Sequence, residues 1–165
     1  MRSARTTTVG IVAAALACSG AAAADAAPAT APVGESLELL DVSRPVAVPD
    51  AVRDGAPPSP GDVFRFDNLL RHPDRRDAAT RQVLGRFPST CTVVEGTRAE
   101  CAGTLVLRDG TIEVTGTPDL ALDTIDMTVL GGSGRYAAVS GSARLTPTGA
   151  DGVSRLVVSL QRPAH

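Results

Sequence analysis

The chain has 165 residues, of which 43% are hydrophobic, and a formal net charge of −2. This acidic balance argues against nucleic acid as a partner, because nucleic-acid-binding proteins present a basic surface. Only 2% of the residues are aromatic, so few rings are present for stacking on a sugar or a base, and the core must consist mainly of Val, Leu, Ile and Ala.

Residues 1–26 have the pattern of an export signal. Arg2 and Arg5 are followed by an apolar run over 9–17 and by alanines that provide a cleavage site. The run is shorter than the roughly 20 residues of a membrane-spanning helix, and no later segment approaches that length. We therefore predict a secreted protein without an integral membrane segment. The alternative is a lipoprotein anchored at Cys18, although Ala15 replaces the Leu that usually lies three positions before such a cysteine.

Removal of the signal leaves about 139 residues, enough for one domain with a single core. We expect residues 27–35 to be disordered and the folded domain to span 36–161. Segment 44–60 contains five prolines. Because proline cannot donate a ladder hydrogen bond or continue a helix interior, this segment is predicted to be an extended loop.

Short segments with strand-like alternation make up the rest of the domain. In 62–70, Phe64, Phe66 and Asn68 share one face, because alternate residues of a strand point the same way. Asp109-Gly110 is typical of a tight hairpin turn. Outside the export signal no segment has helical periodicity, which predicts an all-β protein. The predicted strands are 36–42, 62–70, 81–87, 90–95, 99–108, 111–117, 122–130, 136–146 and 153–161.

Cys91 and Cys101 are the only cysteines after the export signal. Each lies five positions from Gly96, so a hairpin folded about that glycine places them opposite each other, at a Cβ separation that a disulfide spans. A metal site and a reactive thiol are the alternatives. Since His72 and His165 are the only histidines and no clustered ligands accompany them, we predict a structural disulfide and no metal.

Several motifs follow one another at definite spacing: Gly61-Asp62-Val63, Phe66-x-Asn68-x-Leu70, Cys91-Thr92-Val93-Val94, Cys101-x-Gly103-Thr104-Leu105-Val106-Leu107, Gly110-Thr111-Ile112-x-Val114-x-Gly116 and Gly131-Gly132-Ser133-Gly134-Arg135-Tyr136, with Gly141 beyond them. This series resembles the allene oxide cyclase and dirigent barrel superfamily, in particular its small secreted bacterial members, over about residues 36–161. The resemblance implies an eight-stranded antiparallel, calycin-like β-barrel that is often trimeric. It also implies a cavity that holds a small hydrophobic molecule, and an activity that requires no cofactor.

The resemblance also implies site residues. Plant cyclases use a Glu on the first strand and a Cys on a strand that lines the cavity, and Glu38 and Cys91 lie at similar positions. Glu38 is thus a catalytic candidate, or else a solvent-facing residue on an edge strand; Cys91 is no free thiol if it is bonded. Tyr136, the only tyrosine, is a second catalytic candidate, or else a ring packed at the barrel rim.

Phe64, Phe66 and Asn68 are the candidate ligand-binding residues. Asn68 is polar among apolar neighbours, so it needs a partner from backbone, water or ligand.

The sequence leaves three functions open: binding of a small hydrophobic molecule, cofactor-free isomerisation or cyclisation of a reactive lipid-, polyketide- or phenolic-type substrate, and a structural or envelope-associated oligomer. A cavity with an inward Glu38 favours the enzyme, a cavity without any inward ionisable group favours the binder, and a filled barrel favours the structural role.

Overall fold

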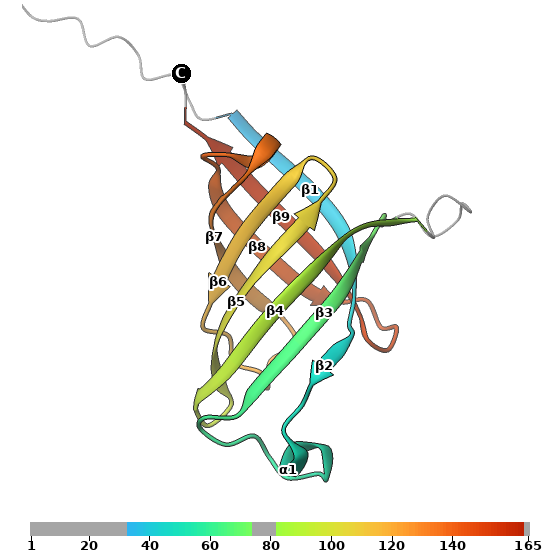
Figure 1. Cartoon of the computed structure of the whole chain (residues 1–165), viewed down its shortest axis with the longest axis vertical. Helices are drawn as coiled ribbons and strands as arrows, with labels where there is room; N and C mark the ends of the chain where they lie inside the picture. The colour runs from blue at the N-terminus through green and yellow to red at the C-terminus, as the bar shows by residue number, and fades with distance from the viewer. Residues whose placement is uncertain (1–32, 74–81, 164–165) are drawn as a thin grey trace, which may run out of the picture.

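The computed structural model describes residues 33–73 and 82–163. The expected export signal, Cys18 and most of the segment expected to be disordered, 27–32, lie outside these residues. The described chain folds into one antiparallel sheet that closes on itself as an eight-stranded barrel with one additional short strand (Figure 1). This confirms the predicted fold class.

The strands follow one another around the barrel in the order β1-β9-β8-β7-β6-β5-β4-β3-β2, and β1 also pairs with β3. A four-residue helix and a 3-10 turn interrupt them. The elements are β1 (Val33–Val42), β2 (Pro45–Ala47), α1 (Asp50–Arg53), β3 (Val63–Arg71), β4 (Val83–Glu95), β5 (Arg98–Leu107), β6 (Gly110–Gly116), β7 (Ile125–Gly132), η2 (Gly134–Tyr136), β8 (Ser140–Pro147) and β9 (Val153–Arg162).

The barrel closes where β1 meets β3. This ladder has three residue pairs, Leu40↔Arg71, Asp41↔Leu70 and Val42↔Leu69, whereas the β1–β9 ladder has ten. Beyond Val42 the chain bends, and β2 continues along the same edge of β3 opposite Arg65 and Phe66. We call the three β1–β3 pairs the closure seam. Together β1 and β2 cover the edge of β3 that would otherwise be unpaired.

Several predicted boundaries were wrong, among them the start of the strand expected at 122–130, which begins at Ile125. Segment 44–60 contains β2 and α1 and is not entirely loop, because β2 is an edge strand and such a strand tolerates its initial Pro45. β1 begins at Val33, inside the segment expected to be disordered, since residues 33–36 pair with the last residues of β9. Residues 136–139 precede β8 and do not belong to it; Tyr136 ends η2.

The predicted strands 81–87 and 90–95 are one continuous strand, β4. Pro88 lies between the two predicted segments, and its fixed φ is compatible with extended backbone. The β4–β5 ladder keeps the same register on both sides of it, from Arg86↔Val106 to Ser89↔Gly103. Gly103 makes this continuity sterically feasible, because a Cβ there would lie 2.6 Å from Cε2 of Phe87 and 3.0 Å from the carbonyl oxygen of Pro88.

The two ends of the barrel differ in packing. The short turn η2 lies at the end of the barrel that is uppermost in Figure 1. Tyr136 of η2 belongs to the main core cluster, together with Leu105, Ile112, Val139 and Leu160. At the lower end, where α1 lies, a second small cluster consists of Cys91, Ala99 and Cys101 with Phe64 and Leu120 packed against it. The unfilled interior space described below lies toward this lower end.

Candidate ligand-binding cavity

A cavity of about 180 Å³ lies inside the lower part of the barrel. Residues from seven of the strands line it, because the interior positions of β1, β3, β4, β5, β7, β8 and β9 converge there. The apolar part of its wall comes mostly from β4, β5, β7 and β8. It consists of Phe66, Phe87, Ala102, Ile125, Met127, Leu145 and the Cys91–Cys101 disulfide. This composition suits an apolar ligand.

The polar part of the wall is concentrated on β9, β1 and β3, which are neighbours in the sheet. Asp41 lies opposite Ser154 in the β1–β9 ladder. Asn68 is on the adjacent strand β3, and Ser43 follows β1 directly. Ser89 of β4 is the remaining polar lining residue. The cavity is therefore polar on one side and apolar on the other.

Asp41 is the single ionisable side chain among the described residues that line the cavity, since the two cysteines are bonded. Its side chain is 3% exposed. Oδ2 accepts a hydrogen bond of 2.8 Å from Nδ2 of Asn68, whereas Oδ1 is buried and has no partner among the described residues. Burial raises the pKa of Asp41 to about 6, against the smaller opposing effect of the Asn68 hydrogen bond.

The side chain of Asn68 makes hydrogen bonds to β1 and to the bend between β1 and β2. Its Oδ1 accepts a hydrogen bond of 2.9 Å from the backbone N–H of Arg44, and its Nδ2 donates to Asp41. The carboxamide orientation is thus fixed from both ends. The partner that the sequence required for Asn68 consists of backbone and a second side chain, and Asn68 still forms part of the cavity wall.

Glu38 lies on the outer surface of the barrel, so the inward carboxyl considered for this position is absent. Its side chain is 41% exposed, and Oε1 accepts a hydrogen bond of 2.7 Å from Nε of Arg155 on β9. Alternation along β1 explains this arrangement: Leu37, Leu39 and Asp41 face inward, and Glu38 faces outward. The sequence signal for Asp41 was its place on the same face as two leucines.

The other candidates are divided between the two ends of the barrel. Tyr136 is 4% exposed and packs into the core at the upper end, and it does not line the lower cavity. Burial is the main reason that its pKa is raised. Phe66 lines the cavity, as does Asn68. Phe64 does not line the cavity; its half-buried ring packs against the cluster that contains the disulfide.

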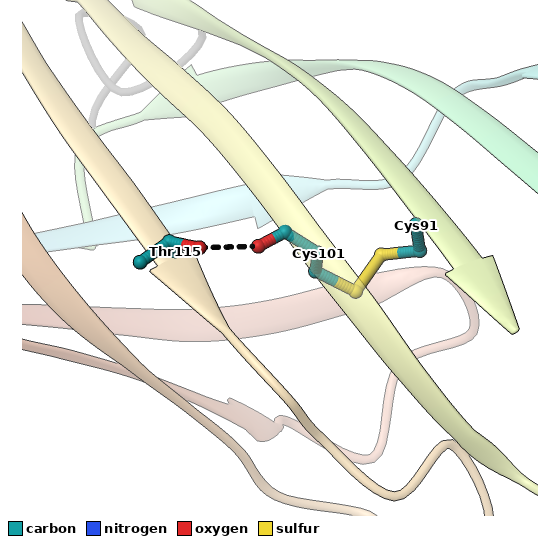
Figure 2. The surroundings of a disulfide bond; sticks show 3 residues. All are labelled: Cys91, Cys101 and Thr115. Carbon is teal, nitrogen blue, oxygen red and sulfur yellow. Dashed lines mark hydrogen bonds between the residues drawn. A yellow bond between two sulfur atoms is a disulfide. The ribbon is translucent and has the colours of Figure 1, made fainter. Parts of the chain in front are cut away.

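The predicted disulfide is confirmed (Figure 2). Cys91 of β4 and Cys101 of β5 are direct ladder partners whose Cα atoms lie 4.0 Å apart. The backbone oxygen of Cys101 also accepts a hydrogen bond of 3.1 Å from Oγ1 of Thr115 on β6 (Figure 2). Both cysteines line the cavity, so the bond is part of the wall that a ligand would contact, and neither sulfur is a free thiol.

Within 33–73 and 82–163, no three His, Cys, Asp or Glu side chains are grouped in a way that could hold a metal ion. The same residues include no helix with the length and apolar character needed to cross a membrane.

No protein-family model and no curated protein matches this sequence. Solved structures do match its fold. A pyocyanin demethylase superposes with a TM-score of 0.62 at 21% identity, covering 76% of this chain and 99% of its own. A pterocarpan synthase dirigent protein has a TM-score of 0.59 at 16% identity, with 82% and 99% covered. This chain has the dirigent barrel fold.

The Diels-Alderase AbmU from Streptomyces koyangensis has the same fold, with a TM-score of 0.60 at 22% identity, and the match covers 79% of this chain and 69% of that one. The expected resemblance to the dirigent and cyclase barrels is thereby confirmed at the level of the fold. Identities this low carry no residue roles from one protein to another, so the chemistry must be argued from the cavity itself.

Proposed function

We propose that this protein is a secreted barrel that binds a small, mainly apolar molecule in its lower cavity. The observation that carries the proposal is the cavity itself, an unfilled interior space with apolar side chains on one side and Asp41, Asn68 and serines on the other. Ligand sites typically combine apolar walls with a few polar groups in this way. The structural neighbours named above include a demethylase, a dirigent protein and a Diels-Alderase, which supports a small-molecule role.

The volume limits the size of the ligand. Pockets for drug-sized molecules are usually about 300–1,000 Å³, and an apolar cavity of about 150 Å³ accommodates benzene. At about 180 Å³, this cavity matches one ring or a compact bicyclic group. A larger molecule would have to extend beyond it.

Two residues of β7 give a matched test of binding. Met127 lines the cavity and is buried, whereas Leu130 faces outward and is 62% exposed. We expect indole and similar compounds to raise the Tm of the wild-type protein and of Leu130→Phe. Met127→Phe should remove this stabilisation, because the larger ring occupies the cavity. Stabilisation of Met127→Phe equal to that of the wild type would place the binding site elsewhere.

A second proposed function is cofactor-free isomerisation or cyclisation, with Asp41 in the role first considered for Glu38. Its pKa of about 6 allows the carboxyl to accept or donate a proton near neutral pH. A minimal assay is exchange of the α-hydrogens of 2-indanone in D₂O, followed by NMR. Acceleration by the wild-type protein and by Glu38→Gln, with loss in Asp41→Asn, would support a proton-transfer role. Exchange at the buffer rate with the wild-type protein would leave only the binding role.

Secretion and trimer formation stay predictions. The disulfide is consistent with an oxidising compartment. N-terminal sequencing of protein recovered from the culture medium tests cleavage near residue 26 and distinguishes it from a lipid anchor at Cys18. Light scattering of the purified protein tests the oligomeric state.

A further inference from the structure

The polar side of the cavity contains an acceptor that no described residue satisfies. Asp41 Oδ1 is buried without a hydrogen-bond partner, although the Asp41 side chain is part of the cavity wall. A buried carboxylate oxygen that lacks a donor is unfavourable, because the desolvation of its charge is not compensated. A donor placed in the cavity beside Asp41 would supply this missing interaction.

The neighbouring amide does not offer an equivalent acceptor. Asn68 Oδ1 already accepts from the backbone N–H of Arg44, and its Nδ2 is directed to Asp41 Oδ2. The remaining polar lining residues are Ser43, Ser89 and Ser154, whose hydroxyl groups can donate or accept. Asp41 is thus the one lining side chain whose ionised form is purely an acceptor.

We propose that the natural ligand carries an N–H or O–H donor on a ring-sized apolar body, and that Asp41 selects it by accepting that hydrogen bond. The inference rests on the proposed binding function and specifies its ligand class. The apolar body contacts Phe87, Ile125 and Met127, and the donor lies toward β1. Because a hydrogen bond to an ionised group is stronger than one between neutral groups, Asp41 favours a donor-bearing ligand over a hydrocarbon of the same shape.

Indole and indene are suitable probes, since they share one fused-ring skeleton and differ at the position where indole has its N–H. We expect the wild-type protein at pH 8 to bind indole at least tenfold more tightly than indene in NMR titrations. Asp41→Leu should reduce this ratio to about two or less. Glu38→Gln removes a carboxylate from the outer face of the same strand and should leave the ratio unchanged.

A second measurement needs no variant. At pH 4.5 Asp41 is mostly protonated, so the indole preference of the wild-type protein should be several-fold smaller than at pH 8. On the strands next to β1, the charged residues nearest in the ladders are Arg71 and Arg155, both opposite Leu40, and neither contributes to the raised pKa of Asp41. The change with pH therefore reports on Asp41.

The outcomes separate the two proposals. Equal affinity of the wild-type protein for indole and indene overturns the donor inference and leaves the binding function intact. A tenfold preference that persists in Asp41→Leu and at pH 4.5 also overturns it, because the discrimination then arises from another residue. Binding of neither probe to the wild-type protein overturns the proposed single-ring cavity function and the inference with it.

Discussion

Asn68 Nδ2 donates a hydrogen bond of 2.8 Å to Asp41 Oδ2 and thereby joins the two strands that close the barrel. The same amide accepts from the backbone N–H of Arg44, in the bend between β1 and β2. One side chain thus stabilises the interrupted edge and orients the buried carboxyl of the cavity. The binding site and the closure seam share residues, so changes in one affect the other.

Ionisation of Asp41 should lower the stability of the fold. Its pKa is raised from 3.8 to about 6, so the folded state binds more protons than the unfolded state between these values. The free energy of unfolding contributed by this group therefore falls as the pH rises from 4 to 6, by roughly 3 kcal/mol in all. Urea unfolding at several pH values should show Asp41→Asn gaining stability relative to the wild type over this range.

Two surface carboxylates change the free energy of unfolding with pH in the opposite direction. The contribution of Asp41 must therefore be measured as the difference between a variant and the wild type. Hydrogen bonds from Arg86 and Arg144 lower the pKa values of Asp67 and Asp126. Their contributions are present above the unfolded pKa and are lost as the pH falls. Asp126→Asn is the control, and its difference from the wild type should change with pH in the other direction. A pH-independent difference between Asp41→Asn and the wild type would contradict a raised pKa at Asp41.

Replacement of Asn68 by Leu should destabilise the protein by about 2–3 kcal/mol at pH 8. The variant loses the donor to the ionised Asp41 and the acceptor for the Arg44 N–H, and both groups remain buried or partly buried. The pKa of Asp41 should rise further, because the Asn68 hydrogen bond is what lowers it. The destabilisation should be smaller at pH 4, where Asp41 is neutral.

Asp67→Asn is the matched control for Asn68→Leu. Asp67 is the preceding residue on β3 and pairs with Arg86 on the outer surface. An exposed ion pair of this kind contributes about 1 kcal/mol or less. Equal destabilisation by the two substitutions would indicate that the buried hydrogen bonds of Asn68 have no special role.

Removal of the disulfide should cost stability without changing the fold. Cys91 and Cys101 are ten positions apart, and closing so short a loop is worth about 2–3 kcal/mol in the chain-entropy model. The double variant Cys91→Ala/Cys101→Ala should melt several degrees below the wild type and retain its far-ultraviolet circular dichroism. A reductant should lower the wild-type Tm to a similar value and leave the double variant unaffected. A reductant-insensitive wild type would contradict the structural role.

Gly103 should not tolerate a side chain. A Cβ at this position would lie 2.6 Å from the ring of Phe87 and 2.8 Å from Cβ of Ser89, so Gly103→Ala should displace Phe87 and cost about 1–3 kcal/mol. Gly34→Ala is the control, because its nearest atom would be 4.0 Å away. Denaturant unfolding of both variants measures the difference. Equal stability would show that β4 shifts without cost.

The sequence predicted the barrel well because the interior positions of its strands alternate cleanly. Phe64, Phe66 and Asn68 were correctly placed on one face, and the spacing of the two cysteines about Gly96 gave their pairing. Two of the errors lie at prolines. The predicted gap at 88–89 was wrong, since the backbone of Pro88 is compatible with an extended strand, and the prolines of 44–60 concealed β2, since a proline can occupy an edge strand.

The site was harder to predict than the fold. The inward carboxyl was assigned to Glu38 by resemblance, although alternation along β1 places Asp41 on the same face as Leu37 and Leu39. A buried acid needs a partner, and Asn68 lies 27 positions away in sequence. Their contact depends on the β1–β3 register. The cavity itself depends on how side chains from seven strands leave space between them, and no local pattern records that.

The shortest ladder of the cylinder, the three pairs of the closure seam, includes Asp41, whose raised pKa places its ionisation between acidic and neutral pH. An ionised carboxylate is better solvated in water than in this buried seam, so its charge favours states in which β1 and β3 are separated. We therefore expect β1 to separate transiently from β3 more often near neutral pH than in acid when the cavity is empty. A bound donor that satisfies Asp41 Oδ1 would oppose this separation, so an occupied cavity would also keep the wall of the barrel closed.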